Sequence, residues 1–254
     1  MTPDPLAPLL ELPGVAEAAD RARDALGRAH RHRANLRGWP TTAAEAAVRA
    51  ARASSVLDGG PVRFDDGDGA AGAVGPADPV FAGALRVAQA LEGGGGALVG
   101  VWQRAPLQAL ARLHMLAAAD QVDPDRLGRP RADPDVGPRL ELLAALVTGS
   151  TRAPAAVVAA VAHGEILTLR PFGSADGVVA RAASRLVTIA SGLDPHGLGV
   201  PEVSWMRQPA AYRDTALGFV GGTPQGIGNW LVLCCRALRD GAEEAVTIAD
   251  AKAG

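Results

Sequence analysis

Aromatic residues are scarce in this chain, at 4% of its 254 residues, although 48% of the residues are apolar and many of those are alanine. A core with so few rings is built mainly from alanine, leucine and valine, whose small side chains let helices pack closely. Runs that alternate apolar and polar residues are also few, whereas helix formers fill the periodic segments. The composition therefore predicts a mainly α-helical protein.

Cysteine is nearly absent, with a single adjacent pair, Cys234 and Cys235. Neighbouring residues on a helix point to different faces, so this pair is poorly placed for a disulfide or for a shared metal ion. We expect both thiols to be buried as small apolar groups.

An excess of charge of one sign is lacking as well, since the net charge is -2. The chain therefore has no basic footprint of the kind that binds nucleic acid. No apolar run reaches the roughly 18–20 residues of a membrane-spanning helix, because His163 and Gly164 interrupt the longest one, residues 153–166. The first residues lack the basic and apolar regions of a signal peptide. We expect a cytosolic protein that binds neither nucleic acid nor membranes.

Helix-forming segments alternate with turns rich in glycine and proline. We expect a charged helix over residues 15–34, then a second helix that begins with Thr41 or Thr42 as N-cap and ends near Leu57. The next segment predicts a loop, with a short strand or hairpin at most near residues 61–64. Further helices are expected at residues 79–92, 106–119, 137–148, 153–167, 177–191, 208–219 and 224–240, with a short tail after them.

Common metal-binding and phosphate-binding patterns are missing or incomplete. An acidic run hints at a calcium loop, but no acidic residue stands at the twelfth position from Asp65 or Asp66. The glycines at residues 93–96 lack the lysine of a phosphate loop, and no Walker, Rossmann or nucleophile-elbow pattern occurs. His30 and His32 have no companion ligands nearby. We therefore expect no metal site.

Residues 163–181 are the most informative stretch, because they predict a helix end, a turn like an anion-binding loop and a new helix. The stretch resembles the signature of Fic-domain proteins, His-Pro-Phe-x-Asp/Glu-Gly-Asn-Gly-Arg-x-x-Arg. Pro171, Phe172, Gly177 and Arg181 fall on that pattern. The resemblance implies a Fic-like helical domain, with a short β-flap or hairpin at most and an N-terminal helical extension.

The resemblance extends over residues 40–240. In the family, the helix that leads into the loop carries a His shortly before the catalytic position, and His163 occupies that place. Other pieces that resemble family features, in the same order, are Leu113 with His114, Gly128 with Arg131, Tyr212 and Trp230. The implied domains are an extension at residues 1–40, an inhibitory-like helix at 41–60, a degenerate core at 61–240 and a tail at 241–254.

Residues 54–59 resemble the inhibitory motif of many Fic proteins, Ser/Thr-x-x-x-Glu-Gly/Asn. Ser54 and Gly59 match it, and Asp58 stands where the family has Glu. In the family that carboxylate pairs with the last Arg of the signature and blocks the productive pose of ATP. The resemblance therefore implies an ion pair between Asp58 and Arg181. The alternative is that Asp58 merely precedes a glycine that ends the helix and has no partner.

Transfer of a nucleotide to a protein hydroxyl needs a base, a carboxylate that holds a metal, backbone amides for the phosphate and cationic groups. Arg170 stands at the base position, but it stays protonated and has no acceptor site. Ser174 replaces the carboxylate, Ala175 the first loop glycine and Val178 the first Arg. Asp176, where the family has Asn, would repel phosphate, although it could supply a displaced carboxylate. The resemblance thus implies a fold while the residues argue against the reaction, and we do not expect ATP with magnesium to bind.

The surviving motif residues also have structural interpretations. Pro171 and Phe172 shape the loop and fill the core, and Gly177 ends a turn. Arg170 has three interpretations: a solvated loop residue, an internal structural cation, or a contact to an anion or a partner. His163 is interpreted as a half-buried helix residue with its hydrogen bonds made, and not as a catalyst.

The main hypothesis is a catalytically degenerate Fic-like protein that acts as a binding or regulatory module, without protein AMPylation. A groove beside the motif, with His163, Arg170, Gly177 and Arg181, would bind a segment of an unknown protein partner or a small anion. The alternative is an enzyme with altered nucleotide- or phosphate-transfer chemistry that recruits Asp176 or His163 as acid or base. A third hypothesis limits the protein to assembly with a partner enzyme, and a homodimer stays open. The backbone amides over Gly177 distinguish the first two hypotheses. Free amides would favour a bound ligand, whereas amides covered by a side chain would disfavour both catalysis and nucleotide binding.

Overall fold

The computed structural model of the chain describes residues 3–61 and 78–253. Within these ranges every regular element is a helix and no strand occurs, so the expected mainly α-helical class is confirmed. Residues 62–64 of the hairpin considered above, and the acidic run that follows them, lie outside the described residues.

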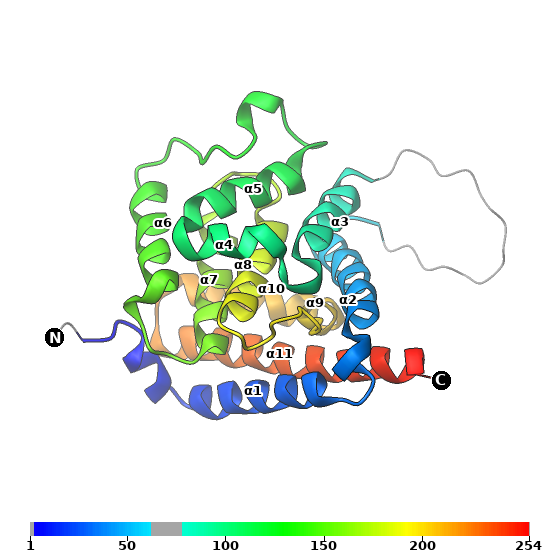
Figure 1. Ribbon diagram of the computed structural model, residues 1–254. Helices are drawn as coiled ribbons and strands as arrows, with labels where there is room; N and C mark the ends of the chain where they lie inside the picture. Colours follow the sequence, from blue (N-terminus) through cyan, green and yellow to red (C-terminus); the bar gives the residue numbers. More distant parts are fainter. Residues whose placement is uncertain (1–2, 62–77, 254) are drawn as a thin grey trace.

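Figure 1 shows how the helices are arranged in space, with an irregular connection between α5 and α6 that holds one short 3-10 turn. In chain order they are α1 (Val15–Arg31), α2 (Asn35–Leu57), α3 (Pro79–Leu91), α4 (Gly96–Arg104), α5 (Pro106–Ala118), α6 (Val136–Ala145), α7 (Ala155–Leu169), α8 (Asp176–Ala190), α9 (Pro201–Arg207), α10 (Pro209–Val220) and α11 (Pro224–Ala253). Short 3-10 turns occur at Ala7–Glu11, Glu92–Gly94 and Pro124–Arg126, and a π-helical turn, Leu146–Ser150, follows α6.

Helices α7 and α8 form the centre of the molecule (Figure 1). Both are buried on nearly all sides, and α7 is rich in alanine and valine. Such small side chains allow close approach of α8, α10 and α11 to α7. Gly164 contributes to this contact, because a Cβ there would lie 2.7 Å from Nε1 of Trp230. The central pair is thus held rigidly, and the loop that joins α7 to α8 is the motif loop.

Helix α2 begins earlier than the N-cap signal at Thr41 or Thr42 predicts, since it starts at Asn35 and continues through Pro40. Asn35 is buried; its Nδ2 donates to the Ala29 carbonyl at 2.8 Å, and its Oδ1 accepts from the Thr42 hydroxyl at 2.7 Å. Thr42 therefore bonds to a side chain and caps no helix. Buried bonds of this kind stabilise the corner between α1 and α2 and compensate for the hydrogen bond that a proline lacks.

Two helices were not predicted, and one prediction ended too early. Helix α4 follows the glycine run, and the short helix α9 lies between the helices expected at 177–191 and 208–219. Helix α11 continues past residue 240 to Ala253. The last turns of α11 are held by packing, because Ile248 lies in an apolar cluster with Ala46 and Ala50 of α2. Two helices thus run across expected domain boundaries, α2 across residue 40 and α11 across residue 240, and the division into domains stays a prediction.

The two cysteines are free and buried, as expected for small apolar groups. Burial raises the pKa of both thiols above its ordinary value, so neither is a reactive thiolate. None of the helices in the described ranges is long and apolar enough to cross a membrane.

Candidate functional site

The motif loop has the expected shape of a helix end, a tight turn and a new helix. Helix α7 ends at Leu169, and the next residue, Arg170, adopts a left-handed backbone conformation with φ 50°. The Gly173 amide donates to the Arg170 carbonyl at 3.2 Å, and Ala175, also at φ 50°, precedes the first residue of α8. Left-handed backbone at two residues other than glycine is uncommon and needs support from the surrounding structure.

Arg131 supplies part of that support. Its Nε donates to the Arg170 carbonyl at 2.8 Å, its Nη2 donates to the Leu169 carbonyl at 3.0 Å, and its own amide donates to the Pro171 carbonyl at 2.7 Å. The carbonyls at the carboxyl end of a helix lack partners within the helix, and a cation suits that end. Arg131 belongs to the Gly-x-x-Arg turn of the resemblance, but the sequence assigned it no contact.

His114 ties the same loop to α5. Its Nδ1 accepts from the Gly128 amide at 2.9 Å, so the ring proton lies on Nε2, which donates to the Ser174 hydroxyl at 3.0 Å. The ring also stacks on Phe172, with centroids 4.2 Å apart. Burial, with help from the charge of Arg126, lowers the pKa of His114 and favours this neutral form. Ser174 is thus engaged in a structural contact at the position where the family has its metal-binding carboxylate.

Asp176 folds back into its own loop. Its Oδ1 accepts from the Phe172 amide at 2.9 Å, whereas its buried Oδ2 has no partner among the described residues. Burial is the main cause that raises the pKa of this carboxyl to about 6. A carboxyl with such a pKa is partly protonated close to neutral pH.

The carboxylate of Asp58, at the end of α2, lies at the N-terminus of α8. Its Oδ1 accepts from Nη2 of Arg181 at 2.8 Å, and its Oδ2 accepts from the Val178 amide at 3.0 Å. A Cβ on Gly177 would lie 2.2 Å from Oδ1, so the carboxylate fills the space directly over that glycine. The expected ion pair between Asp58 and Arg181 is therefore present, and an internal carboxylate occupies the kind of place where a helix N-terminus binds an anion.

Arg181 is buried, with 2% of its residue surface exposed, and its donors meet acceptors of three residues, Ser54 and Asp58 at the end of α2 and Tyr212 of α10. Besides Asp58, its Nε donates to the Ser54 hydroxyl at 2.8 Å, its Nη2 to the Ser54 carbonyl at 3.0 Å and its Nη1 to the Tyr212 hydroxyl at 3.4 Å. Burial acts to lower the pKa of this guanidinium, but Asp58 and Tyr212 outweigh it and raise the pKa overall. Breaking such a buried pair from one side is strongly destabilising.

His163 lies behind this ion pair and is fully buried, so the expectation of a half-buried residue with all its hydrogen bonds made was wrong. Its Nε2 shares a hydrogen bond of 2.7 Å with the Tyr212 hydroxyl, and its Nδ1 has no partner among the described residues. Trp205 and Trp230 meet its ring edge-on. Burial, and then the charge of Arg181, hold its pKa well below the ordinary value, so the ring is neutral.

A depression of about 390 Å³ remains beside the loop. Arg170 and Gly177 line it, while the other two residues expected in the groove, His163 and Arg181, are buried. Arg170 is exposed, and no residue in the described ranges accepts a hydrogen bond from its guanidinium. The remaining lining residues are Asp58, Val80, Gln121, Leu167, Ala175, Asp176 and Val178.

Apart from the exposed arginine, the groups of this site that could contact an anion are already engaged by other residues. The amide of Val178 and the space over Gly177 are taken by the carboxylate of Asp58. Ser174 offers a hydroxyl where the family has a carboxylate, and the depression places two carboxylates beside its one arginine. Across residues 3–61 and 78–253, no group of three His, Cys, Asp or Glu side chains is arranged to hold a metal ion.

Comparisons with known proteins show the fold alone. No family model matches the chain, and no curated protein matches it. Among solved structures, the chain is similar to a Fic family protein from Desulfovibrio desulfuricans G20, with a TM-score of 0.63 and 16% sequence identity over 92% of this chain and 74% of that one. The fold is therefore Fic-like, whereas an identity this low carries no function from one chain to the other.

Proposed function

We propose that this protein is a catalytically degenerate Fic-like protein, which acts as a binding or regulatory module and does not transfer nucleotides to proteins. The observation that carries the proposal is the position of Asp58, whose carboxylate bonds to Arg181 and to the Val178 amide over Gly177. A phosphate at the N-terminus of α8 would have to displace this carboxylate and break a largely buried ion pair.

The side chains of the loop support the same proposal. A base that accepts a proton is absent at Arg170, because a guanidinium stays protonated and has no acceptor site. His163 cannot reach a substrate, since its ring is fully buried and bonded to Tyr212. The groups that would react are thus replaced or enclosed, while the scaffold around them is kept.

The proposed contact to a partner is made by Arg170, at the edge of the depression. Its guanidinium is exposed beside Asp58 and Asp176, so the site presents both signs of charge. A free phosphate would be repelled by the two carboxylates, whereas a protein segment can place an acidic group on Arg170 and a basic or amide group on the carboxylates. We therefore propose a protein segment, and not a nucleotide, as the occupant.

An enzyme with altered chemistry remains the alternative, and Asp176 favours it. Its carboxyl lines the depression, and a pKa of about 6 suits a general acid or base near neutral pH. Phosphate release from a small phosphoester, lost in Asp176→Asn and kept in wild type, would support this alternative.

Calorimetric titration of the protein with ATP and magnesium tests the main proposal. We expect no measurable heat of binding, and a micromolar dissociation constant would contradict the proposal. The second arm uses Asp58→Ala, which vacates the space over Gly177, with ATP labelled on the α-phosphate. We expect no label on the protein itself or on proteins of a lysate, so incorporation in this variant would show that the loop is still competent.

A further inference from the structure

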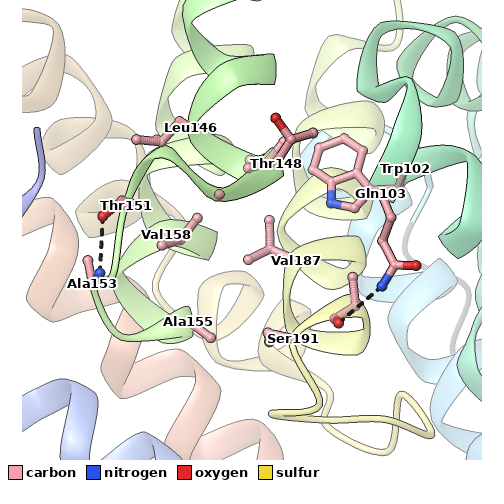
Figure 2. Close-up of a pocket in the computed structure, with 13 residues that line it drawn as sticks. Trp102, Gln103, Leu146, Thr148, Thr151, Ala153, Ala155, Val158, Val187 and Ser191 are labelled. Atoms are coloured by element: carbon pink, nitrogen blue, oxygen red, sulfur yellow. Dashed lines mark hydrogen bonds between the residues drawn. The ribbon is translucent and has the colours of Figure 1, made fainter. Parts of the chain in front are cut away.

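A second hollow lies at the far ends of α7 and α8 from the motif loop (Figure 2). Its volume of about 460 Å³ is in the range of small-molecule pockets. The lining side chains come from α4, α7, α8 and the π-helical turn after α6. They are Trp102, Gln103, Leu146, Val147, Thr148, Gly149, Thr151, Ala153, Ala155, Val158, Val187, Ala190 and Ser191.

The wide turn at Leu146–Ser150 forms one wall of this hollow (Figure 2). Gly149 adopts φ 117°, which few other residues tolerate, and the turn leads into Thr151. The Thr151 hydroxyl donates to Asp4 at 2.7 Å and accepts from the Ala153 amide at 3.0 Å, which fixes the chain as it enters α7. The wall is therefore held in place by hydrogen bonds, and π-helical turns of this kind are frequent at functional sites.

Trp102 provides a hydrogen-bond donor inside the hollow. Its side chain is almost entirely buried, with 1% of its surface exposed, and its indole nitrogen faces the hollow in Figure 2. No described residue accepts a hydrogen bond from this Nε1, whereas Nε1 of the equally buried Trp230 donates to the Ala160 carbonyl at 2.8 Å. This Nε1 is therefore a free donor at the wall of the hollow, and an acceptor on a bound molecule can take its hydrogen bond.

The remaining chemistry of the walls defines the occupant. None of the thirteen lining residues is charged. Val158 and Val187 face each other across the middle, and Ser191 lies at the border (Figure 2). A charged ligand would lose its hydration here without a partner. We propose that this hollow binds a small neutral molecule with an apolar body and one hydrogen-bond acceptor, which takes the bond from Nε1 of Trp102.

Two neutral probes of nearly the same shape test the proposal, acetophenone and α-methylstyrene. The second has a methylene group where the first has its carbonyl oxygen, so only the first can accept a hydrogen bond. In nitrogen-15 spectra, the indole signal of Trp102 is identified by its loss in Trp102→Phe. We expect acetophenone to shift this signal saturably and to bind roughly three- to tenfold more tightly than α-methylstyrene, the range of one net hydrogen bond. In Trp102→Phe, with binding followed through the remaining signals, the two probes should bind equally.

A filling variant and a matched control complete the experiment. Ala155→Leu places a larger side chain in the hollow and should abolish binding of both probes, whereas Ala210→Leu, at an exposed position on α10, should leave binding unchanged. The proposal is overturned if acetophenone gives no saturable shift, if it binds no more tightly than α-methylstyrene, or if Ala155→Leu binds it as well as wild type does. The readout is independent of nucleotide binding, so it stands or fails separately from the proposed function.

Discussion

Asp58 and Arg181 form an ion pair with 2.8 Å between Oδ1 and Nη2. The side chain of the arginine is 1% exposed and that of the aspartate is 20% exposed. The same carboxylate caps α8 through the Val178 amide. One side chain from the end of α2 thus satisfies a buried cation and a helix N-terminus at once, and it joins two segments that are 123 residues apart in the chain.

Removal of this carboxylate should destabilise the fold. Asp58→Ala leaves Arg181 with the bonds to Ser54 and Tyr212 but without its counter-charge. We expect the free energy of unfolding to fall by on the order of 1–3 kcal/mol, measured by chemical denaturation. Asp214→Ala, at an exposed position on α10, is the control and should change stability by less than about 0.5 kcal/mol. Equal stabilities of the two variants would argue that the pair contributes nothing.

The contact over Gly177 can be isolated by a double-mutant cycle. In wild type, Gly177→Ala places a Cβ 2.2 Å from Oδ1 of Asp58 and should cost about 1–3 kcal/mol. In the Asp58→Ala background that space is vacant, so the same substitution should be neutral or stabilising by up to about 1 kcal/mol, as alanine is in a helix.

Gly137→Ala is the matched control for that cycle. Gly137 is likewise the second residue of its helix, α6, and a Cβ there meets nothing within 4 Å. It should be neutral or stabilising in both backgrounds. A cycle in which the two substitutions at Gly177 and Asp58 are simply additive would mean that the carboxylate does not lie over the glycine.

Asp176 should make stability fall as pH rises. Its pKa is about 6 in the folded protein and near 3.8 when the chain is unfolded. As pH rises from 4 to 6, the unfolded chain therefore loses its proton first, and the folded state is penalised progressively. Asp176→Asn keeps the acceptor for the Phe172 amide and removes the charge. We expect the variant to gain on the order of 2 kcal/mol over wild type between pH 4 and pH 7, measured by urea denaturation at each pH, and a constant difference would refute this assignment.

His163 should have the opposite dependence. Its pKa is well below the ordinary 6.5 because the ring is buried next to Arg181. Below pH 6.5, His163 becomes protonated in the unfolded chain but stays neutral in the folded protein. The free energy of unfolding therefore decreases as pH falls, by up to about 1.4 kcal/mol per pH unit. His163→Gln keeps a hydrogen-bonding group near Tyr212 without titrating. The melting temperature of this variant should fall less between pH 6.5 and pH 5 than that of wild type, and parallel curves would exclude the prediction.

The sequence predicted those features that depend on local pattern. Helix α2 ends at Leu57, just before the glycines, and helices α3 and α5 begin with a proline, close to the expected positions. Residues that begin or end a helix act within one helical turn, so their effect can be read from the local sequence. The pair of Asp58 and Arg181 was found through resemblance, since no periodicity or spacing brings residues so far apart together.

Features that depend on tertiary contact were missed. The early start of α2 rests on the buried bonds of Asn35, and the final turns of α11 rest on the packing of Ile248. Neither can be read from propensity, because both segments gain their stability from another helix. The indole of Trp102, which lines a hollow with residues far away in the chain, is equally invisible in the sequence.

Arg131 lies outside the motif loop, yet its bonds to the carbonyls of Leu169 and Arg170 hold the loop in shape. The shape of the loop therefore depends only in part on the side chains of the loop itself. The tie comes from 38 and 39 residues earlier in the chain, so substitutions inside the loop can alter what it contacts without redirecting α7 and α8. Evolution can thus replace every reactive side chain of such a loop while the architecture persists. The signature residues and the fold that carries them are therefore separable, and the absence of the former in a sequence does not exclude the latter.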